Sequence, residues 1–238
     1  MIEFINVTYS IVENGMEKTI LNNFSYKFKK GLTTAITGPN GGGKSTITKL
    51  IMGIFTPTTG KILYNGKDIT NLSVDKRANL GINYAFQKPI NFKGITVKDL
   101  IDIAAGKENT VSQACTYLSK VGLCAKEYIN REFDDTLSGG EQKRIELAIA
   151  LAKKGNCYVF DEPEAGIDMW SFDKLKDIFE NNKTIIIVSH QEKLLKSANE
   201  IVVVERGKIK HCGKAKEVLD AVNNLKCKRI VGGENGIK

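Results

Sequence analysis

Alternating apolar and polar residues open the chain and predict a layer of antiparallel strands. Residues 2–9 alternate as in a strand with one buried face, and residues 19–28 resume the same pattern. Between them lies Asn14-Gly15, a pair typical of a two-residue hairpin turn. The sequence therefore predicts an N-terminal antiparallel β layer.

The next segments change from strand to helix. Residues 33–37 form a short apolar run that leads into a glycine-rich turn, and residues 45–52 have helical periodicity. From about 92 to 136 the strand signals vanish, and two helical stretches appear at 97–105 and 111–121. Thr96 can cap the first of these helices, with Asp99 at the position where a capping box usually has Glu or Gln.

Helices and buried strands alternate in the second half of the chain. The pattern predicts helices over 140–153 and 170–180, and buried strands over 157–160 and 184–189. Such alternation builds a mostly parallel sheet covered by helices. No internal repeat is visible. We therefore expect one α/β domain over residues 1–238, in which about 92–136 form a helical subdomain and about 221–238 a C-terminal tail.

Composition indicates an ordinary globular protein, with 42% hydrophobic and 26% charged residues. The first residues lack the basic start and apolar run of a secretory signal, and no stretch approaches the ~20 apolar residues that span a bilayer. We expect a cytoplasmic protein. Its five cysteines form no CxxC pair or Cys/His cluster, which argues against a zinc site and fits reduced thiols.

The net charge of +8 raises the question of a nucleic-acid partner. The lysines, however, are spread along the chain and interleaved with acidic residues. The main local excess lies near the C-terminus, where a solvated face explains it. We therefore expect no nucleic-acid partner.

Candidate chemistry begins in the glycine-rich turn, which carries the phosphate-binding pattern GxxxxGK[ST]. Its residues are Gly38, Pro39, Asn40, Gly41, Gly42, Gly43, Lys44, Ser45 and Thr46. Glycines let successive N–H groups point at phosphate oxygens, and the following helix offers its positive end. Lys44 would reach the β- and γ-phosphates, and Ser45 would bind Mg²⁺. A plain glycine-rich turn is the alternative, but the flanking strand and helix favour nucleotide binding.

A second candidate site follows the buried strand at 157–160, which ends in Asp161 and Glu162. Asp161 at the strand tip is suited to hold Mg²⁺ through water. Glu162 is suited to orient and polarise an attacking water, as phosphoryl transfer to water requires. Such a pair is common after strands, and it gains meaning here from the phosphate-binding loop.

Residues 137–144, Leu-Ser-Gly-Gly-Glu-Gln-Lys-Arg, resemble the signature motif of the ATP-binding cassette (ABC) family. Further positions match that family in the same order: Gln87 resembles the Q-loop glutamine, Asp168 the D-loop aspartate and His190 the switch histidine. The resemblance covers approximately residues 2–220. It implies an α/β fold with a RecA-like P-loop NTPase core, an N-terminal antiparallel β layer and an inserted α-helical subdomain.

The resemblance also implies a function, a Mg²⁺-dependent ATP hydrolase that acts as an ATP-dependent homodimer. Ser138, Gly139 and Gly140 at a helix start form an anion site, and in the family the phosphate bound there belongs to the ATP of the opposite subunit. The catalytic residues implied by the resemblance are Glu162, His190, Gln87 and Lys44. Asp168 would join the nucleotide site, and the implied Mg²⁺ ligands are Ser45, Gln87 and Asp161.

The chain departs from transporter cassettes at several positions. Ile11 stands where an aromatic residue usually stacks on adenine, and nearby Tyr9 has packing in the β layer as its simplest role. After the signature, Glu146 replaces a small residue and Ile149 an arginine. With residues 161–168, Asp-Glu-Pro-Glu-Ala-Gly-Ile-Asp, these features resemble SufC-type ATPases, the soluble cassette proteins of iron–sulfur cluster assembly.

Two kinds of partner therefore remain open. The SufC-like interpretation, which the departures favour, implies a SufB- or SufD-like scaffold protein. The alternative is the nucleotide-binding subunit of an ABC transporter, peripheral to the membrane and docked on a permease through the cleft near Gln87. A non-enzymatic cassette protein is disfavoured because Lys44, Asp161, Glu162 and His190 are all present.

Overall fold

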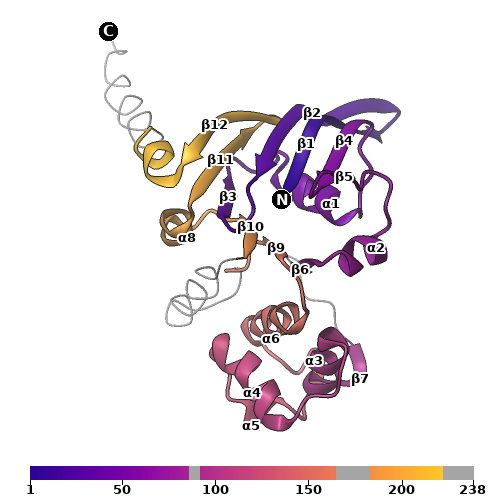
Figure 1. The fold of residues 1–238 in the computed structure, drawn as a ribbon, viewed down its shortest axis with the longest axis vertical. Coiled ribbons are helices and arrows are strands. Elements are labelled where there is room, and N and C mark those ends of the chain that lie inside the picture. The colour runs from indigo at the N-terminus through magenta and orange to yellow at the C-terminus, as the bar shows by residue number, and fades with distance from the viewer. Residues whose placement is uncertain (86–91, 165–182, 222–238) are drawn as a thin grey trace.

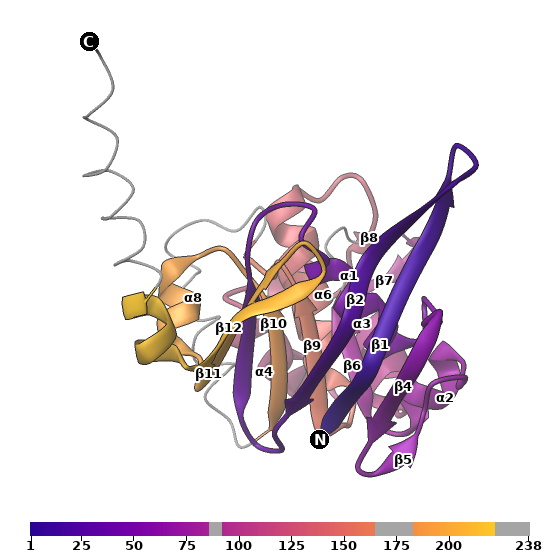
Figure 2. The same cartoon turned by 90° about the horizontal axis from the view of Figure 1, so that it is seen from above.

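The computed structural model describes residues 1–85, 92–164 and 183–221. Within them, the antiparallel sheet has the strand order β2-β1-β4-β5. Its strands are β1 (Ile2–Glu13), β2 (Met16–Phe28), β4 (Thr59–Tyr64) and β5 (Lys67–Asp68). Asn14 and Gly15 join β1 to β2 with φ angles of 53° and 76°, as a two-residue turn requires. The predicted β layer and its turn are confirmed, and Figure 2 shows the hairpin projecting beyond the rest of the sheet.

The second sheet of the described residues has the order β12-β11-β3-β10-β9-β6. All its strands run parallel except β12, which pairs with β11 in the antiparallel sense at one edge. Its strands are β3 (Thr33–Thr37), β6 (Ile82–Ala85), β9 (Cys157–Asp161), β10 (Thr184–Val188), β11 (Glu200–Glu205) and β12 (Lys208–Lys214). The predicted, mostly parallel sheet is confirmed.

The central strands β9 and β10 are buried on both faces. Tyr158 and Phe160 of β9 join the core that includes the helical part of the chain, whereas Val159 joins the core below the antiparallel sheet. Strand β10 alternates in the same way. The continuous apolar runs seen in the sequence arise from this double burial. Figure 1 shows the resulting layers, with the antiparallel sheet on one side and α3 to α6 on the other.

Four described helices were predicted from the sequence, and their ends agree with the prediction to within one residue. The described helices are α1 (Lys44–Met52), α2 (Val74–Asn79), α3 (Val97–Ala105), α4 (Val111–Lys120), α5 (Ala125–Tyr128), α6 (Gly139–Ala152) and α8 (Glu192–Ser197). The helix predicted over 170–180 and the tail at 222–238 lie outside the described residues.

The prediction that strands are absent between 92 and 136 is wrong. β7 (Phe92–Thr96) and β8 (Glu132–Phe133) pair antiparallel on either side of α3 to α5. The two strands are short and partly exposed, so neither carries a readable alternation. Their pairing is tertiary, with the rings of Phe92 and Phe133 stacked at 6.5 Å.

The predicted Thr96 cap at the start of α3 is confirmed. Asp99 takes the role usually filled by Glu or Gln, because its carboxylate accepts from the backbone N–H of Thr96 while the Thr96 hydroxyl accepts from the N–H of Asp99. Two N–H groups of the first turn thereby gain partners.

Arg77 of α2 fixes the end of the helix that follows the glycine-rich loop. Its side chain is fully buried, and it donates to the carbonyls of Leu50, Ile51, Thr70 and Leu72 at 2.6–2.9 Å. Burial lowers the pKa of Arg77 to about 10. Carbonyls in the last turn of a helix have no partner within the helix. Arg77 therefore satisfies the C-terminal end of α1 and joins it to α2.

We expect Arg77→Met to lower the free energy of unfolding by about 3 kcal/mol or more, because buried carbonyls lose their donors at about 1–3 kcal/mol each. Urea unfolding measures this change. Lys76→Met on the exposed face of the same helix is the matched control, with an expected change within about 0.5 kcal/mol. Equal unfolding free energies for the two variants would contradict this role of Arg77.

Candidate nucleotide-binding and catalytic site

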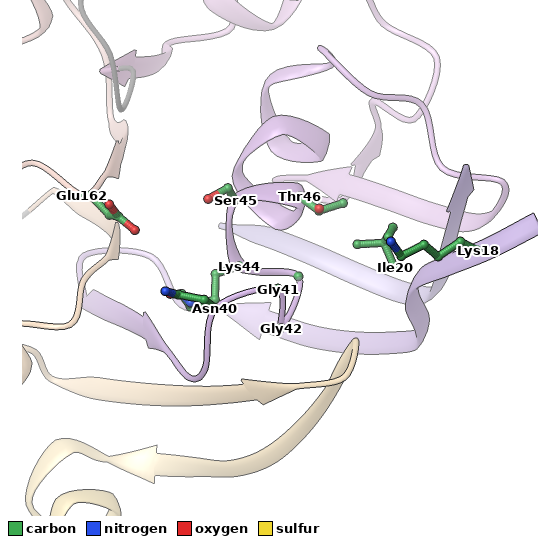
Figure 3. A pocket seen from close by; sticks show the side chains of 10 residues that line it. Lys18, Ile20, Asn40, Gly41, Gly42, Lys44, Ser45, Thr46 and Glu162 are labelled. Atoms are coloured by element: carbon green, nitrogen blue, oxygen red, sulfur yellow. The ribbon is translucent and has the colours of Figure 1, made fainter. Parts of the chain in front are cut away.

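A pocket of about 490 Å³ lies at the N-terminal end of α1 (Figure 3). Most of its lining comes from the predicted phosphate-binding loop, and the rest comes from β2 and from the end of β9. The lining residues are Lys18, Ile20, Asn40, Gly41, Gly42, Gly43, Lys44, Ser45, Thr46 and Glu162. The structure thus brings the predicted loop and Glu162 to one cavity.

The glycines of the loop are required by its close approach to β11. A Cβ atom on Gly38 would lie 2.0 Å from the carbonyl oxygen of Val204, and one on Gly42 would lie 2.8 Å from the same atom. Gly38 also has a φ of 139°, which side chains rarely allow. The loop consequently presents backbone to the pocket, as a phosphate cradle needs.

Lys44 supplies a positive charge at the centre of this loop. Its Nζ donates to the carbonyls of Gly38 and Pro39, each at 2.9 Å. Burial lowers the pKa of Lys44, and the carboxylates of Glu162 and Asp161 oppose that shift. The ammonium is therefore already held in place against the loop where an anion would enter.

Asp161 lies buried at the tip of β9, among three hydroxyl groups. Ser45 Oγ donates to Asp161 Oδ1 at 3.2 Å, while Thr48 Oγ1 and Tyr84 Oη donate to Oδ2 at 3.1 and 3.2 Å. Burial raises the pKa of Asp161, and these hydrogen bonds act against that shift. Sequence analysis missed Thr48 and Tyr84, and only the pairing of β6 with β9 brings Tyr84 to this position.

The donor set fits a magnesium ion. Mg²⁺ prefers oxygen ligands and takes few of them from protein, usually one or two beside phosphate and water. The hydroxyl of Ser45 and the carboxylate of Asp161 are the two predicted protein ligands, and their oxygens lie 3.2 Å apart. The third predicted ligand, Gln87, lies outside the described residues.

Glu162 and His190 follow neighbouring parallel strands. Val188 of β10 pairs with Asp161 of β9, and the N–H of Glu162 donates to the carbonyl of Val188 at 2.9 Å. Glu162 has a φ of 49°, a left-handed conformation that is uncommon for a side-chain-bearing residue and often marks a functional site. Its side chain lines the pocket, while His190 is exposed at the end of β10. The predicted site residue Asp168 lies outside the described residues.

The signature residues begin α6. The hydroxyl of Ser138 accepts from the N–H of Glu141 at 3.3 Å, and Glu141 accepts from the N–H of Ser138 at 2.7 Å. Hydrogen bonds lower the pKa of Glu141 to about 2, and the bond from the Tyr128 hydroxyl has a larger effect than those from Ser138. Gly139 leaves open space where a Cβ would stand. Among the described residues that line the pocket, none is Ser138, Gly139 or Gly140.

The β layer gives structural neighbours to Tyr9 and Ile11, in the region where the chain departs from transporter cassettes. Tyr9 stacks on Phe55 with ring centroids 5.0 Å apart, so its ring packs in the β layer as its simplest role predicts. Ile11 pairs with Lys18 across the hairpin. Lys18 and Ile20, two residues apart on β2, line the pocket, and sequence analysis did not identify them.

Glu146 has a structural explanation of its own. Its carboxylate accepts from Lys143 Nζ at 3.1 Å, and the Lys143 side chain is only 1% exposed. A buried ammonium without a partner would be costly. Ile149, the other unusual residue of this helix, packs against the core that includes the helical part of the chain.

A glycine-rich loop between a strand and a helix, with its lysine and a strand-end carboxylate on one pocket, defines a P-loop nucleotide-binding protein. A family model described as ABC transporter matches residues 21–165, more than half of the chain. An uncharacterized ABC transporter ATP-binding protein of Methanocaldococcus jannaschii is 35% identical over 84% of this chain and 85% of its own length. The energy-coupling factor transporter ATP-binding protein of Spiroplasma kunkelii is 32% identical over 94% of this chain and 78% of its own length. The chain therefore belongs to the ABC transporter family.

Solved structures establish the same fold. A dimeric ATP-binding cassette in a post-hydrolysis state, bound to ADP and inorganic phosphate, has a TM-score of 0.81 at 24% identity over 90% of this chain and 99% of that chain. A bacterial Atm1-family ABC exporter with ATP bound has a TM-score of 0.77 over 92% of this chain and 40% of that chain. The predicted α/β cassette fold is confirmed.

Family membership makes this chain an ABC-type ATPase, with ATP and Mg²⁺ as its cofactors. Within the part of the chain that the structure describes, no helix is both long enough and apolar enough to cross a membrane.

Proposed function

We propose that this protein is the nucleotide-binding subunit of an ABC transporter, which hydrolyses Mg-ATP between two copies of itself to move a membrane permease. The observation that carries the proposal is that the predicted site residues fall into two separate groups. Lys44, Ser45 and Glu162 line one pocket, whereas Ser138 caps a helix that contributes nothing to it. A second copy can supply the missing half.

The residues of the pocket have distinct roles in this proposal. Backbone N–H groups of the glycine-rich loop and the Lys44 ammonium bind the β- and γ-phosphates. Ser45 and Asp161 would hold Mg²⁺, which when bound would supply positive charge next to the phosphate oxygens. Glu162 orients the attacking water, and His190 and Gln87 act with it as catalytic residues. Gln87 is also a proposed Mg²⁺ ligand, and Asp168 joins the nucleotide site.

The signature helix completes the site from the opposite copy. The first turn of α6 offers the positive end of the helix, and the N–H groups of a helix start favour an anion. Ser138 and the two glycines after it can approach a γ-phosphate closely, since Gly139 has open space around it. The solved cassette with a TM-score of 0.81 is itself dimeric, with ADP and phosphate bound.

In this proposal, residues 1–238 form one ABC ATPase domain, and residues 92–136 form its helical subdomain.

A membrane permease is the partner that the comparisons favour. The relatives from Methanocaldococcus jannaschii and Spiroplasma kunkelii are both named as transporter ATP-binding proteins. Glu146, one basis for the SufC-like interpretation, is accounted for by its ion pair with Lys143. A SufB- or SufD-like scaffold remains a second candidate, because Ile11 pairs with Lys18 where transporters usually place an adenine-stacking ring.

The partner can be identified by purifying tagged protein from its native cells, from detergent-solubilised membranes and from the soluble fraction. We expect a polytopic permease to copurify from the membranes, and ATP hydrolysis to rise several-fold when that permease is reconstituted in proteoliposomes. Lys44→Ala, which should not respond to ATP, is the control for coupling. Recovery with a SufB- or SufD-like scaffold from the soluble fraction alone would replace the transporter proposal with the cluster-assembly one.

A further inference from the structure

Glu164 lies two residues after Glu162 and reaches across to the end of the neighbouring strand. Its Oε1 accepts a hydrogen bond from the hydroxyl of Ser189 at 2.5 Å and a longer one from the N–H of His190 at 3.4 Å. The carboxylate therefore contacts the two residues that directly follow β10. None of the motifs in the sequence assigns a role to Glu164.

Ser189 is itself held from three directions. Its N–H donates to the carbonyl of Ile36 on β3 at 3.1 Å, and its hydroxyl accepts from the N–H of Gln191 at 3.0 Å. The same hydroxyl donates to Glu164. Ser189 is fully buried, so a lost partner would not be replaced by water. The bond from Ser189 to Glu164 thus ties the turn that carries His190 to the segment that carries Glu162.

This arrangement is unfavourable for Glu164. Its Oε2 is buried and has no hydrogen-bond partner among the described residues. Burial raises the pKa of Glu164, and the negative charge of Glu162 adds to the shift. A buried carboxylate oxygen without a partner costs stability. The buried Oε2 offsets part of what the hydrogen bond to Ser189 contributes to stability, and the contacts of Glu164 with the turn that carries His190 point to a further role.

We propose that Glu164 is a positioning residue for ATP hydrolysis: its carboxylate holds Ser189 and the backbone of His190, so that His190 keeps a fixed position relative to Glu162. This inference rests on the roles proposed above for Glu162 and His190. Misplacement of a catalytic group by about 1 Å can slow a reaction up to about a hundredfold. Binding of ATP, which depends on the glycine-rich loop and Lys44, should be unaffected.

The first test compares Glu164→Ala with Glu164→Gln in steady-state ATPase assays of the full chain. Alanine removes the acceptor for Ser189, and we expect kcat to fall about tenfold with KM for ATP within twofold. Glutamine keeps an acceptor oxygen at the same reach, so kcat should stay within about twofold of the starting protein. Ser189→Ala removes the donor of the same bond and should reproduce the alanine result.

A double-mutant cycle with His190→Ala tests whether Glu164 acts through His190. We expect no further loss when Glu164→Ala is added to His190→Ala. Multiplying losses would show that Glu164 acts independently, and an unchanged kcat in Glu164→Ala alone would also overturn the proposal. If His190→Ala itself leaves kcat unchanged, the catalytic role of His190 fails first, and the role of Glu164 fails with it.

Thermal unfolding separates positioning from a structural role. We expect the unfolding midpoint of Glu164→Gln to stay within about 2 °C of the starting protein, and that of Glu164→Ala to fall by several degrees because Ser189 loses a buried partner. The ATPase assays are therefore run at a temperature at which both variants are folded. If kcat falls in Glu164→Ala only in proportion to a loss of folded protein, or if Glu164→Gln loses as much activity as Glu164→Ala, Glu164 does not position His190 through this hydrogen bond.

Discussion

Replacing Lys44 with alanine is expected to weaken ATP binding about 100-fold or more. The Lys44 ammonium is held at the phosphate loop by two carbonyls at 2.9 Å, and it lines the pocket. A hydrogen bond to a charged group contributes about 1.5–3 kcal/mol, and a triphosphate offers several acceptors to one ammonium. Each 1.4 kcal/mol is about tenfold in affinity. Titration calorimetry with ATP measures the change.

Lys49→Ala is the matched control for charge. Lys49 lies on the same helix as Lys44 but over the ring of Phe55, and it does not line the pocket. Lys49→Ala removes one positive charge from α1, as Lys44→Ala does. If Lys44 acts through local contacts with the phosphates, the ATP affinity of Lys49→Ala should stay within about twofold of the starting protein. Unchanged affinity in Lys44→Ala would remove the basis for the phosphate-binding assignment.

Replacing Glu162 with glutamine is expected to slow turnover by about a hundredfold or more while ATP still binds. Glutamine keeps the size of the side chain, and the backbone cost at a φ of 49° remains similar. It loses the negative charge that, in the proposed role of Glu162, polarises the attacking water, and positioned general bases contribute about 10²- to 10⁴-fold. Since hydrolysis would separate the two copies, an ATP-bound dimer should accumulate.

Steady-state ATPase assays and light scattering test both parts of this prediction. Glu192→Gln serves as the control, because Glu192 lies on α8 just beyond His190 with a side chain that is 67% exposed. Near-normal turnover in Glu162→Gln would exclude Glu162 as the general base. A variant that stays monomeric with Mg-ATP at high protein concentration would instead contradict the site shared between two copies.

The contacts around Asp161 illustrate what could be predicted and what could not. The carboxylate after a buried strand and the serine of the glycine-rich loop were readable as a pair, because each belongs to a local motif with a known chemical role. Tyr84 and Thr48 carry no such motif. They reach Asp161 because β6 pairs with β9 and because α1 packs against β9.

The same distinction applies to Glu146 and Tyr9. From the sequence, Glu146 was an unusual acidic residue that favoured one branch of the family over another. In the structure it is the partner of a buried lysine three residues earlier on the same helix. From the sequence, the ring of Tyr9 could stack either on a bound adenine or on another side chain. In the structure it stacks on Phe55, which is 46 residues further along the chain.

The sequence by itself determined the local elements: the β1–β2 turn at Asn14-Gly15, the glycine-rich loop before α1 and the start of α6 next to Ser138. Backbone preferences, helix caps and glycine-rich loops act over a few residues, so they can be read along the chain. Only the tertiary structure decided that β7 pairs with β8, that Lys18 lines the pocket and that Glu164 reaches Ser189. These contacts join residues distant in sequence, and their formation depends on how the sheets and helices pack.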